Sequence, residues 1–520
     1  MKTLQLLIIG FLLLSVSCQH DGKGEIKKTV KTNSETGVRK YVSLNVNDSV
    51  PVTLFDGTEA TVRLLKVNYK KDEIRKAVRE ANLLVSVDGE EKWISAGNQN
   101  LPVKFRNVKI DCPITRAHLE NGNFPKGMWR LKKEVKLRIW PVKYNVNHGD
   151  MFTFQSKQKW FGSGQTTHGL EPVEIDHDCT KPHDKDKIYY HWGMDLAGVK
   201  GYTPVIAAAD GVVISVGRVE LGKPSENDSD YKKDEPFFNV PDSIANLPKP
   251  RFERVFVRMK NGWVYRYSHL YKINVKLGDS VKGGDVIGIL GNNMSDFAHN
   301  HFEIWSIDKD DNNNFTLELA YPYMWESYIR IHDPDILAVV GPHKYIAVGD
   351  SVKLDGHRSV SFKGKINSYE WTFHDGTKAE GKEVYKKFEK PGYYSEMLKV
   401  TDDKGNSACG FANVIVVYKN KPDKIYGYPT AGYYPTFGLK AGDTITFKGR
   451  YFNIEEGEDH WDFGDGTTAI THSKGKPYAP NGYVELKHVY KKPGNYIVTF
   501  TRKTNEGIPS TCQLCVEVGK

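Results

Sequence analysis

Short apolar runs separated by glycine, asparagine and proline make up most of this chain, and they constrain its fold more than any other feature. Runs such as "ATVRLLKV" and "VKLRIWPV" have the length of β-strands, and no long stretch carries the periodicity of a helix. At 520 residues the chain is too long for a single hydrophobic core. We therefore expect a mainly β, multidomain protein of about three to five domains.

The N-terminus, residues 1–18, has the features of an export signal. Its apolar run at 4–16 is too short to span a bilayer and is typical of a signal peptide. Cys18 follows small residues, which resembles the lipobox of bacterial lipoproteins, although Ser15 stands where that family usually has leucine. The resemblance implies a lipid on Cys18 that anchors the protein in the bacterial cell envelope, on its periplasmic or surface face. An ordinary secretory signal is the alternative. Gln19 follows Cys18 where an aspartate would favour retention in the inner membrane, so the outer membrane is the expected location of the lipid anchor.

Residues 19–39 are polar and lack aromatic side chains, which predicts a flexible tether. The net charge of the chain is +9, and the basic residues are spread out rather than gathered in a block. We therefore interpret the charge as solvated surface and expect no nucleic-acid partner.

Residues 40–150 contain short strand-like runs and are expected to form a separate N-terminal β-domain, to which the sequence assigns no role. Within this region, residues 70–82, "KKDEIRKAVREAN", are expected to form a short helix.

Cysteines are few once Cys18 is set apart. The remaining five are Cys112, Cys179, Cys409, Cys512 and Cys515. In an oxidising compartment we expect a disulfide between Cys112 and Cys179, and the odd number leaves at least one thiol unpaired. Cys512 and Cys515 would face opposite sides of a strand and could not bridge without a bend.

A repeat occupies the C-terminal part of the chain. "YEWTFHDGT" and "DHWDFGDGT" match each other, and each is followed by a lysine-rich run and a Pro-Gly turn. These residues resemble PKD domains, which implies immunoglobulin-like β-sandwiches at 338–419 and 422–519. Their expected role is that of spacers or of adhesion modules with protein or carbohydrate contacts. We interpret Asp375 and Asp465 as turn residues; the alternative, calcium ligation, needs six or more oxygen ligands that the sequence does not supply.

The residues able to do chemistry lie between 190 and 305. His191 and Asp195 are four apart in "HWGMDLAG", His269 lies in "YRYSHLY", and His299 and His301 lie two apart in "AHNHFEIW". On a strand, residues two apart project from the same face, so the last two imidazoles would share one space. Two neutral imidazoles and one carboxylate are a common ligand set for catalytic zinc, which keeps a fourth position for water.

This segment resembles the lysostaphin-type (LytM-like) zinc metallopeptidases, whose sequences carry H-x-x-x-D, Y-x-H-L and H-x-H motifs in that order. Here the matching letters are "HWGMD", "YSHL" and "HNH", and glycine-rich segments at 201–217 and 275–291 also match. The resemblance implies an antiparallel β peptidase domain at about 151–335.

The same resemblance implies a role for each of these five residues. His191, Asp195 and His301 would be the zinc ligands. His299 would be the general base, and His269 would assist it or stabilise the intermediate.

The sequence departs from the family in three places. Asn300 stands where H-x-H usually holds leucine, "NNMSDFA" replaces the usual small-residue approach to H-x-H, and a polar insertion spans about 220–251. The insertion is expected to be a loop beside the cleft, and it bears on substrate choice more than on mechanism.

The leading hypothesis is a metalloendopeptidase that hydrolyses peptidoglycan stems or cross-bridges. Proteolysis of extracellular proteins shares the chemistry, and a non-catalytic envelope module that keeps the fold is an alternative from another class. A rival metal cluster at His177, Cys179 and His183 is interpreted as a solvated loop, because it offers only three ligands among Asp and Lys.

Overall fold

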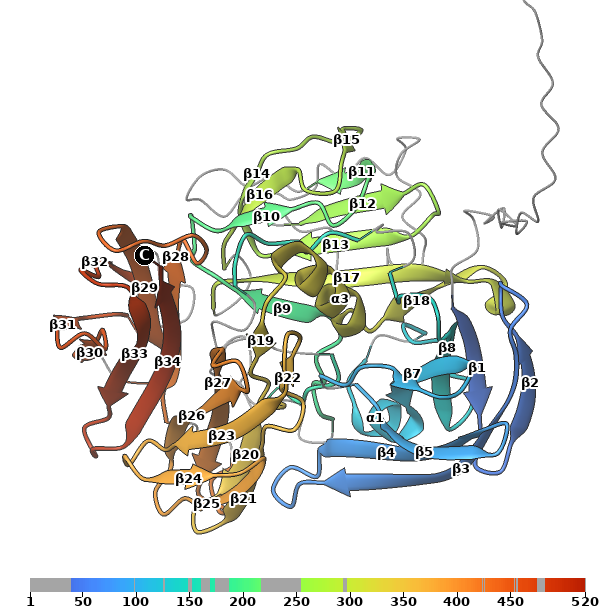
Figure 1. Ribbon diagram of the computed structural model, residues 1–520, viewed down its shortest axis with the longest axis horizontal. Coiled ribbons are helices and arrows are strands. Elements are labelled where there is room, and N and C mark those ends of the chain that lie inside the picture. Colours follow the sequence, from blue (N-terminus) through green and yellow to red (C-terminus); the bar gives the residue numbers. More distant parts are fainter. Residues whose placement is uncertain are drawn as a thin grey trace, which may run out of the picture. The chain divides into compact units, whose positions relative to one another are not determined.

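The computed structural model describes residues 39–519 except 98, 125–126, 148–151, 160–168, 174–186, 217–253, 293–296, 423, 425, 453, 455–456 and 475–481. Strands make up most of this part of the chain (Figure 1), which confirms the mainly β expectation. The expected signal segment with Cys18, nearly all of the expected tether and the insertion at 220–251 lie outside the described residues. Within the described ranges no helix has both the length and the apolar character needed to cross a membrane.

In its described residues, the N-terminal region has two antiparallel sheets and one short helix. Its elements are β1 (Lys40–Leu44), β2 (Ser49–Thr53), β3 (Glu59–Lys71), β4 (Val78–Val87), β5 (Glu90–Ser95), β6 (Val103–Lys104), β7 (Val108–Thr115), α1 (Arg116–Asn121) and β8 (Val135–Pro141). The strand orders are β1-β8-β7-β6 and β2-β3-β4-β5.

The helix expected at 70–82 is wrong. β3 continues to Lys71, and β4 begins at Val78 and pairs with β3 along its length. Between the strands, the carboxylate of Asp72 accepts backbone N–H bonds from Ile74 at 3.0 Å and Arg75 at 2.6 Å, which closes a tight turn. Cross-strand pairing and burial of β4 therefore override the helix-forming composition of the segment.

The central region holds the candidate site. Its elements are β9 (Met194–Ala197), β10 (Pro204–Ile206), β11 (Gly211–Val216), β12 (Val255–Met259), β13 (Val264–Ser268), β14 (Leu270–Ile273), β15 (Ser280–Val281), β16 (Val286–Leu290), β17 (His299–Asp308), the 3-10 helix η3 (Lys309–Asp311), β18 (Asn314–Glu318) and α3 (Tyr321–His332). The main sheet has the order β15-β11-β12-β13-β17-β18, with β9 also paired to β17, and a second sheet has the order β10-β16-β14. β17 therefore lies between β13 and β9 (Figure 1).

The N-terminal and central regions share a core. One buried cluster includes Trp129 from the first region and Trp305 and Leu317 from the second. Beneath it, the buried guanidinium of Arg138 donates at 2.8 Å to Asp111 and also pairs with Glu318 of β18. Buried charges require such partners, so this network also links the two regions.

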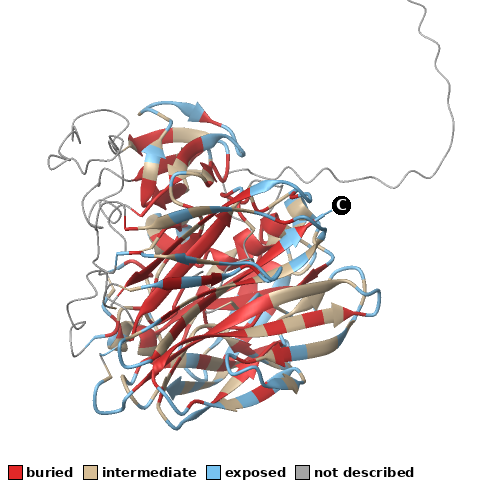
Figure 2. Ribbon diagram, turned by 90° about the vertical axis from the view of Figure 1, so that its left-hand side faces the viewer, coloured by how far each residue is buried: buried red, intermediate tan, exposed pale blue. Residues whose placement is uncertain are grey.

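The C-terminal region consists of two β-sandwiches. Its elements are β19 (Ile336–Leu337), β20 (Lys344–Ala347), β21 (Ser351–Asp355), β22 (Val360–Ser361), β23 (Ile366–Thr372), β24 (Lys378–Glu380), β25 (Glu383–Lys387), β26 (Gly392–Asp402), β27 (Ser407–Val417), β28 (Tyr428–Tyr434), β29 (Thr444–Phe452), β30 (Asp459–Asp462), β31 (Thr468–Thr471), β32 (Val484–Val489), β33 (Gly494–Lys503) and β34 (Pro509–Val518). Trp371 and Trp461, the tryptophans of the repeat, are both buried in the cores of their sandwiches. Figure 2 shows buried segments running through the sheets, while exposed residues gather towards strand ends and turns.

The aspartates of the repeat act as turn residues. Asp375 accepts a backbone N–H bond from Thr377 at 3.0 Å, and Asp465 accepts the equivalent bond from Thr467 at 3.0 Å. Asp465 also accepts a 2.9 Å bond from His488. Their oxygens therefore serve the turn and its neighbours, as the sequence predicted.

Among the described residues, no disulfide joins any two of Cys112, Cys409, Cys512 and Cys515. Cys179 lies outside the described residues, so its bond to Cys112 stays a prediction.

Candidate metal centre

Three adjacent strands bring the chemistry-bearing residues together. His301 of β17 pairs with Asp195 of β9 on one side and with Ser268 of β13 on the other. Side chains of directly opposite residues in an antiparallel pair share a face, so Asp195 and His301 adjoin. His269 follows β13 directly, and His299 begins β17.

A glycine makes room for His301. A Cβ atom at Gly193 would lie 2.7 Å from both Cε1 and Nε2 of His301 and 2.8 Å from the carbonyl oxygen of Phe302. Any residue other than glycine at position 193 would displace the imidazole of His301. The glycine of "HWGMD" is therefore part of the site, a role that the motif spacing alone did not reveal.

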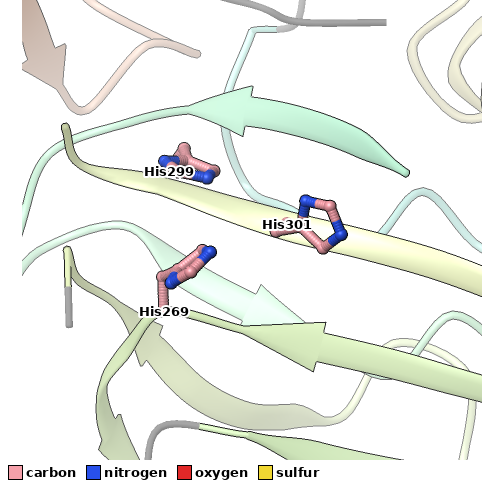
Figure 3. A group of neighbouring side chains, drawn as sticks. All are labelled: His269, His299 and His301. Carbon is pink, nitrogen blue, oxygen red and sulfur yellow. The ribbon is translucent and has the colours of Figure 1, made fainter. Parts of the chain in front are cut away.

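His269 occupies a backbone conformation that side chains other than glycine rarely adopt, with φ at 65°. Its side chain is buried, and its ring centroid lies 4.6 Å from that of His299 and 5.9 Å from that of His301. Strained backbone of this kind concentrates at functional sites. Figure 3 shows His299 and His301 on one strand and His269 reaching them from the neighbouring one.

His191, Asp195 and His301 form a compact ligand set. His191 Nε2 lies 3.0 Å from His301 Nδ1 and 3.1 Å from Asp195 Oδ1, and His301 Nδ1 lies 2.9 Å from the same oxygen. Ligand atoms bound tetrahedrally to zinc at about 2.0–2.1 Å lie roughly 3.3 Å apart. The donor types and their separations therefore fit a zinc ion with little movement.

A second group overlaps with this one. His269, His299 and His301 also place one ligand atom each within 4.8 Å of one another, and all three side chains are buried. This group has no carboxylate to offset the charge of a dication. The two groups share His301, and the set containing Asp195 has the donor chemistry of a catalytic zinc site.

The other nitrogen of His301 is held by Glu303, two residues along β17. His301 Nε2 donates to Glu303 Oε1 at 2.8 Å, which leaves Nδ1 to face the other candidate ligands. Glu303 is fully buried, accepts hydrogen bonds from Trp192 Nε1 at 3.0 Å and Trp305 Nε1 at 2.7 Å, and forms an ion pair with Arg266 at 2.8 Å. A carboxylate that orients a metal-binding histidine is a common supporting feature. The same-face spacing of 301 and 303 on a strand is the sequence signal for this role, which the H-x-H motif alone does not indicate.

The charges of the site favour metal binding. Burial opposes ionisation of Asp195, yet the neighbouring imidazole of His191 holds the pKa of this carboxyl well below its usual range. Burial likewise opposes a charge on His191, but the Asp195 carboxylate raises the pKa of that imidazole overall. Arg266 and His301 lower the pKa of the buried Glu303 carboxyl. The site therefore holds ionised carboxylates close to imidazoles.

His299 is oriented by backbone. Its Nδ1 lies 2.9 Å from the carbonyl oxygen of Phe297, which can only accept, so Nδ1 carries the proton. Nε2, which lies 3.3 Å from Asp195 Oδ1, is then the basic nitrogen. This tautomer is the one that a general base at this position requires.

The structure thus brings all five predicted site residues together in one buried cluster. The rival residues His177, Cys179 and His183 lie outside the described residues, as does Cys18, the predicted lipidation site.

Comparison with known families agrees with this geometry. Residues 251–314 match the family described as Peptidase family M23, and residues 333–417 and 430–516 match PKD domain families. The chain therefore contains an M23-type peptidase domain and two PKD domains, which confirms the resemblance found in the sequence. The peptidase match includes His269, His299 and His301 and begins after His191 and Asp195. It supports a metallopeptidase.

Two curated relatives match parts of the chain. An uncharacterized metalloprotease of Buchnera aphidicola subsp. Baizongia pistaciae (strain Bp) is 29% identical over 238 residues, which are 41% of this chain and 54% of that protein. Collagenase ColA of Clostridium perfringens (strain 13 / Type A) is 28% identical over 118 residues, which are 22% of this chain and 11% of that protein. The chain thus spans about half of one relative and about a tenth of the other.

Solved structures give more distant matches. The catalytic domain of the antimicrobial peptidase lysostaphin from Staphylococcus simulans is 21% identical, with a TM-score of 0.20, over 31% of this chain and 92% of that one. A putative glycyl-glycine endopeptidase from Ruminococcus gnavus ATCC 29149 is 19% identical, with a TM-score of 0.20, over 34% of this chain and 59% of that one.

Proposed function

We propose that the protein is a zinc metalloendopeptidase that hydrolyses peptide bonds in the stems or cross-bridges of peptidoglycan. The observation that carries this proposal is the convergence of His191 Nε2, Asp195 Oδ1 and His301 Nδ1 to within 2.9–3.1 Å of one another beside two further imidazoles. A structural zinc site would use all its neighbours as ligands, whereas here His269 and His299 remain beside the set for proton and oxyanion chemistry.

His191, Asp195 and His301 would hold the zinc. When bound there, the ion lowers the pKa of water and polarises a peptide carbonyl. Glu303 keeps the ring of His301 in the orientation that presents Nδ1 to the ligand set.

His299 and His269 supply the proton chemistry. Nε2 of His299 accepts a proton from the attacking water and passes it to the amine nitrogen as the carbon–nitrogen bond breaks. His269, whose ring lies 4.6 Å from that of His299, donates a hydrogen bond to the oxyanion that forms on the scissile carbonyl. The burial of all five side chains strengthens these interactions, because water screens them less.

We further propose that a lipid on Cys18 tethers the enzyme in the bacterial envelope, where the substrate is a fixed polymer. The PKD domains would contribute protein or carbohydrate contacts. A non-catalytic envelope module is the second candidate, but a module that only binds has no need of the two imidazoles beside the ligand set.

Mass spectrometry of purified peptidoglycan tests the proposal. The zinc-loaded chain from residue 19 onward is incubated with peptidoglycan and, in parallel, with a denatured protein, and a His299→Ala variant serves as the control. New amines and carboxyls that appear only in peptidoglycan and depend on His299 are expected. Fragments from the protein alone would assign a protein substrate, and zinc binding without any fragments would favour the module.

A further inference from the structure

The segment just before the H-x-H strand contacts the second PKD domain as well as the peptidase domain. The ring of Phe297 stacks on His299 with centroids 4.1 Å apart, and on another side it meets Tyr428 of β28 at 6.1 Å. Phe297 therefore lies between the candidate general base and the second PKD domain.

Phe297 packs on a small apolar cluster that several regions share. The first PKD domain contributes Tyr345, Tyr393, Ile415 and Val417, the second contributes Tyr428 and Phe452, and the N-terminal region contributes Ile74. A ring in such a position has little freedom to move unless these regions separate.

The peptide unit that follows Phe297 is held at both ends. Its N–H, on Ala298, donates to the hydroxyl oxygen of Tyr483 in the second PKD domain at 2.7 Å. Its carbonyl oxygen, on Phe297, accepts the Nδ1–H of His299 at 2.9 Å. Because a peptide unit is planar, the bond that Ala298 N–H donates to Tyr483 fixes the direction of the Phe297 carbonyl, which sets the tautomer of His299.

The neighbouring backbone of Ala298 is constrained as well. Its carbonyl oxygen accepts the N–H of Gly198 at 3.3 Å, and its side chain is buried. The backbone of β28 approaches the same loop, since a Cβ atom at Gly432 would lie 3.2 Å from the carbonyl oxygen of Gly198. The second PKD domain is thus packed against both strands that carry the site, β9 and β17, at their ends.

We propose that the second PKD domain is a positioning element of the catalytic site, acting through Tyr483 and the Phe297–Ala298 peptide unit to hold His299 in its basic tautomer. This inference rests on the proposed function and extends it, because it assigns a part in the reaction to a domain that was expected to be a spacer or an adhesion module. Tyr483 and Phe297 are positioning residues, since neither contacts the reacting atoms.

The test substitutes Tyr483→Phe, which removes the hydroxyl acceptor and keeps the ring. Tyr202→Phe is the matched control. The Tyr202 hydroxyl donates to Glu485 of the second PKD domain at 2.8 Å, so its loss also removes a bond to that domain, but it does not touch the Phe297–Ala298 unit. Both variants are made in the zinc-loaded chain from residue 19 onward, with its histidines labelled with ¹⁵N for NMR. The signals of His299 are assigned as those that disappear in His299→Ala.

In the wild type and in Tyr202→Phe, the His299 signals should report a proton on Nδ1, and in Tyr483→Phe they should shift towards a mixture of tautomers. The turnover number of Tyr483→Phe should fall about 5-fold, the expected effect of one neutral hydrogen bond, with KM and zinc content unchanged. Unchanged His299 signals in Tyr483→Phe, or equal shifts in the two variants, would overturn the inference. If the wild type hydrolyses nothing, the proposed function fails, while the ¹⁵N signals still decide the positioning role.

Discussion

Tyr483 and His299 bond to opposite ends of the same peptide unit. The hydroxyl oxygen of Tyr483 accepts the N–H of Ala298, and the ring of His299 donates to the carbonyl oxygen of Phe297. Ala298 and Tyr483 are 185 residues apart in the chain. The orientation of the candidate base therefore depends on a contact that is remote in sequence and belongs to a different domain.

Glu303→Gln should weaken zinc binding. The glutamate holds His301 Nε2 at 2.8 Å, and loss of such a partner typically costs about 10–100-fold in metal affinity. Competition with a zinc chelator measures the effect. Trp305→Phe is the matched control, because it removes a 2.7 Å bond to the other oxygen of Glu303 without touching His301. Equal zinc affinities in Glu303→Gln and wild type would contradict the assigned role.

Gly193→Ala should also weaken zinc binding, for a steric reason. The added Cβ would lie 2.7 Å from the ring of His301, so the imidazole must leave its position between Asp195 and Glu303. We expect a fall in zinc affinity of at least about 10-fold, comparable to the loss of an orienting partner. Isothermal titration with zinc checks this, and a variant that binds zinc as tightly as the wild type would show that the strand yields instead.

His191→Ala and His269→Ala should separate binding from catalysis. His191 belongs to the ligand set with Asp195, whereas His269 lies beside it, with its ring centroid 5.9 Å from that of His301. His191→Ala should lose stoichiometric zinc, and His269→Ala should keep zinc while its turnover number falls about 100-fold or more. Metal analysis with kinetics on the same samples gives both values. The opposite pattern, zinc lost in His269→Ala and kept in His191→Ala, would identify the three-histidine group as the metal site.

His118 should make the N-terminal region sensitive to acid. Nδ1 of its buried ring is hydrogen-bonded to the hydroxyl of Thr115 at 2.8 Å. Burial lowers the pKa of this imidazole to about 3. In the unfolded chain the pKa returns to about 6.5, so below that pH the unfolded state binds a proton that the folded state does not. Stability is therefore full above about pH 6.5 and falls as the pH drops towards 3.

Urea unfolding of wild type and His118→Gln at several pH values measures this contribution. Between pH 6.5 and 5 the wild type should lose about 2 kcal/mol of unfolding free energy relative to the variant. Parallel pH profiles for the two proteins would show that His118 is not held neutral in the fold.

Much of the site could be predicted from the sequence because its signals are local. The two-residue period of a strand places His299 and His301 on one face, and the "HWGMD" spacing joins His191 to Asp195. The β-sandwiches were recognisable for the same reason, since Trp461 and the turn after it both lie inside the nine-residue motif "DHWDFGDGT".

What the sequence did not reveal depends on pairing between distant segments. Residues 70–82 have the composition of a helix, yet pairing of β3 with β4 extends them into a hairpin. The helix α3, Tyr321–His332, was not foreseen, because its buried face is rich in aromatic residues that also suit strands. The link from Tyr483 to Ala298 has no sequence signal at all, since only the packing of the second PKD domain creates it.

The most direct test of the central claim is a crystal structure of the zinc-loaded protein with data collected at the zinc absorption edge. The anomalous peak should lie among His191 Nε2, Asp195 Oδ1 and His301 Nδ1, with His299 Nε2 close to it and not bound. A peak among His269, His299 and His301 would contradict the assignment, because the proposed base would then be a ligand and could not take the proton.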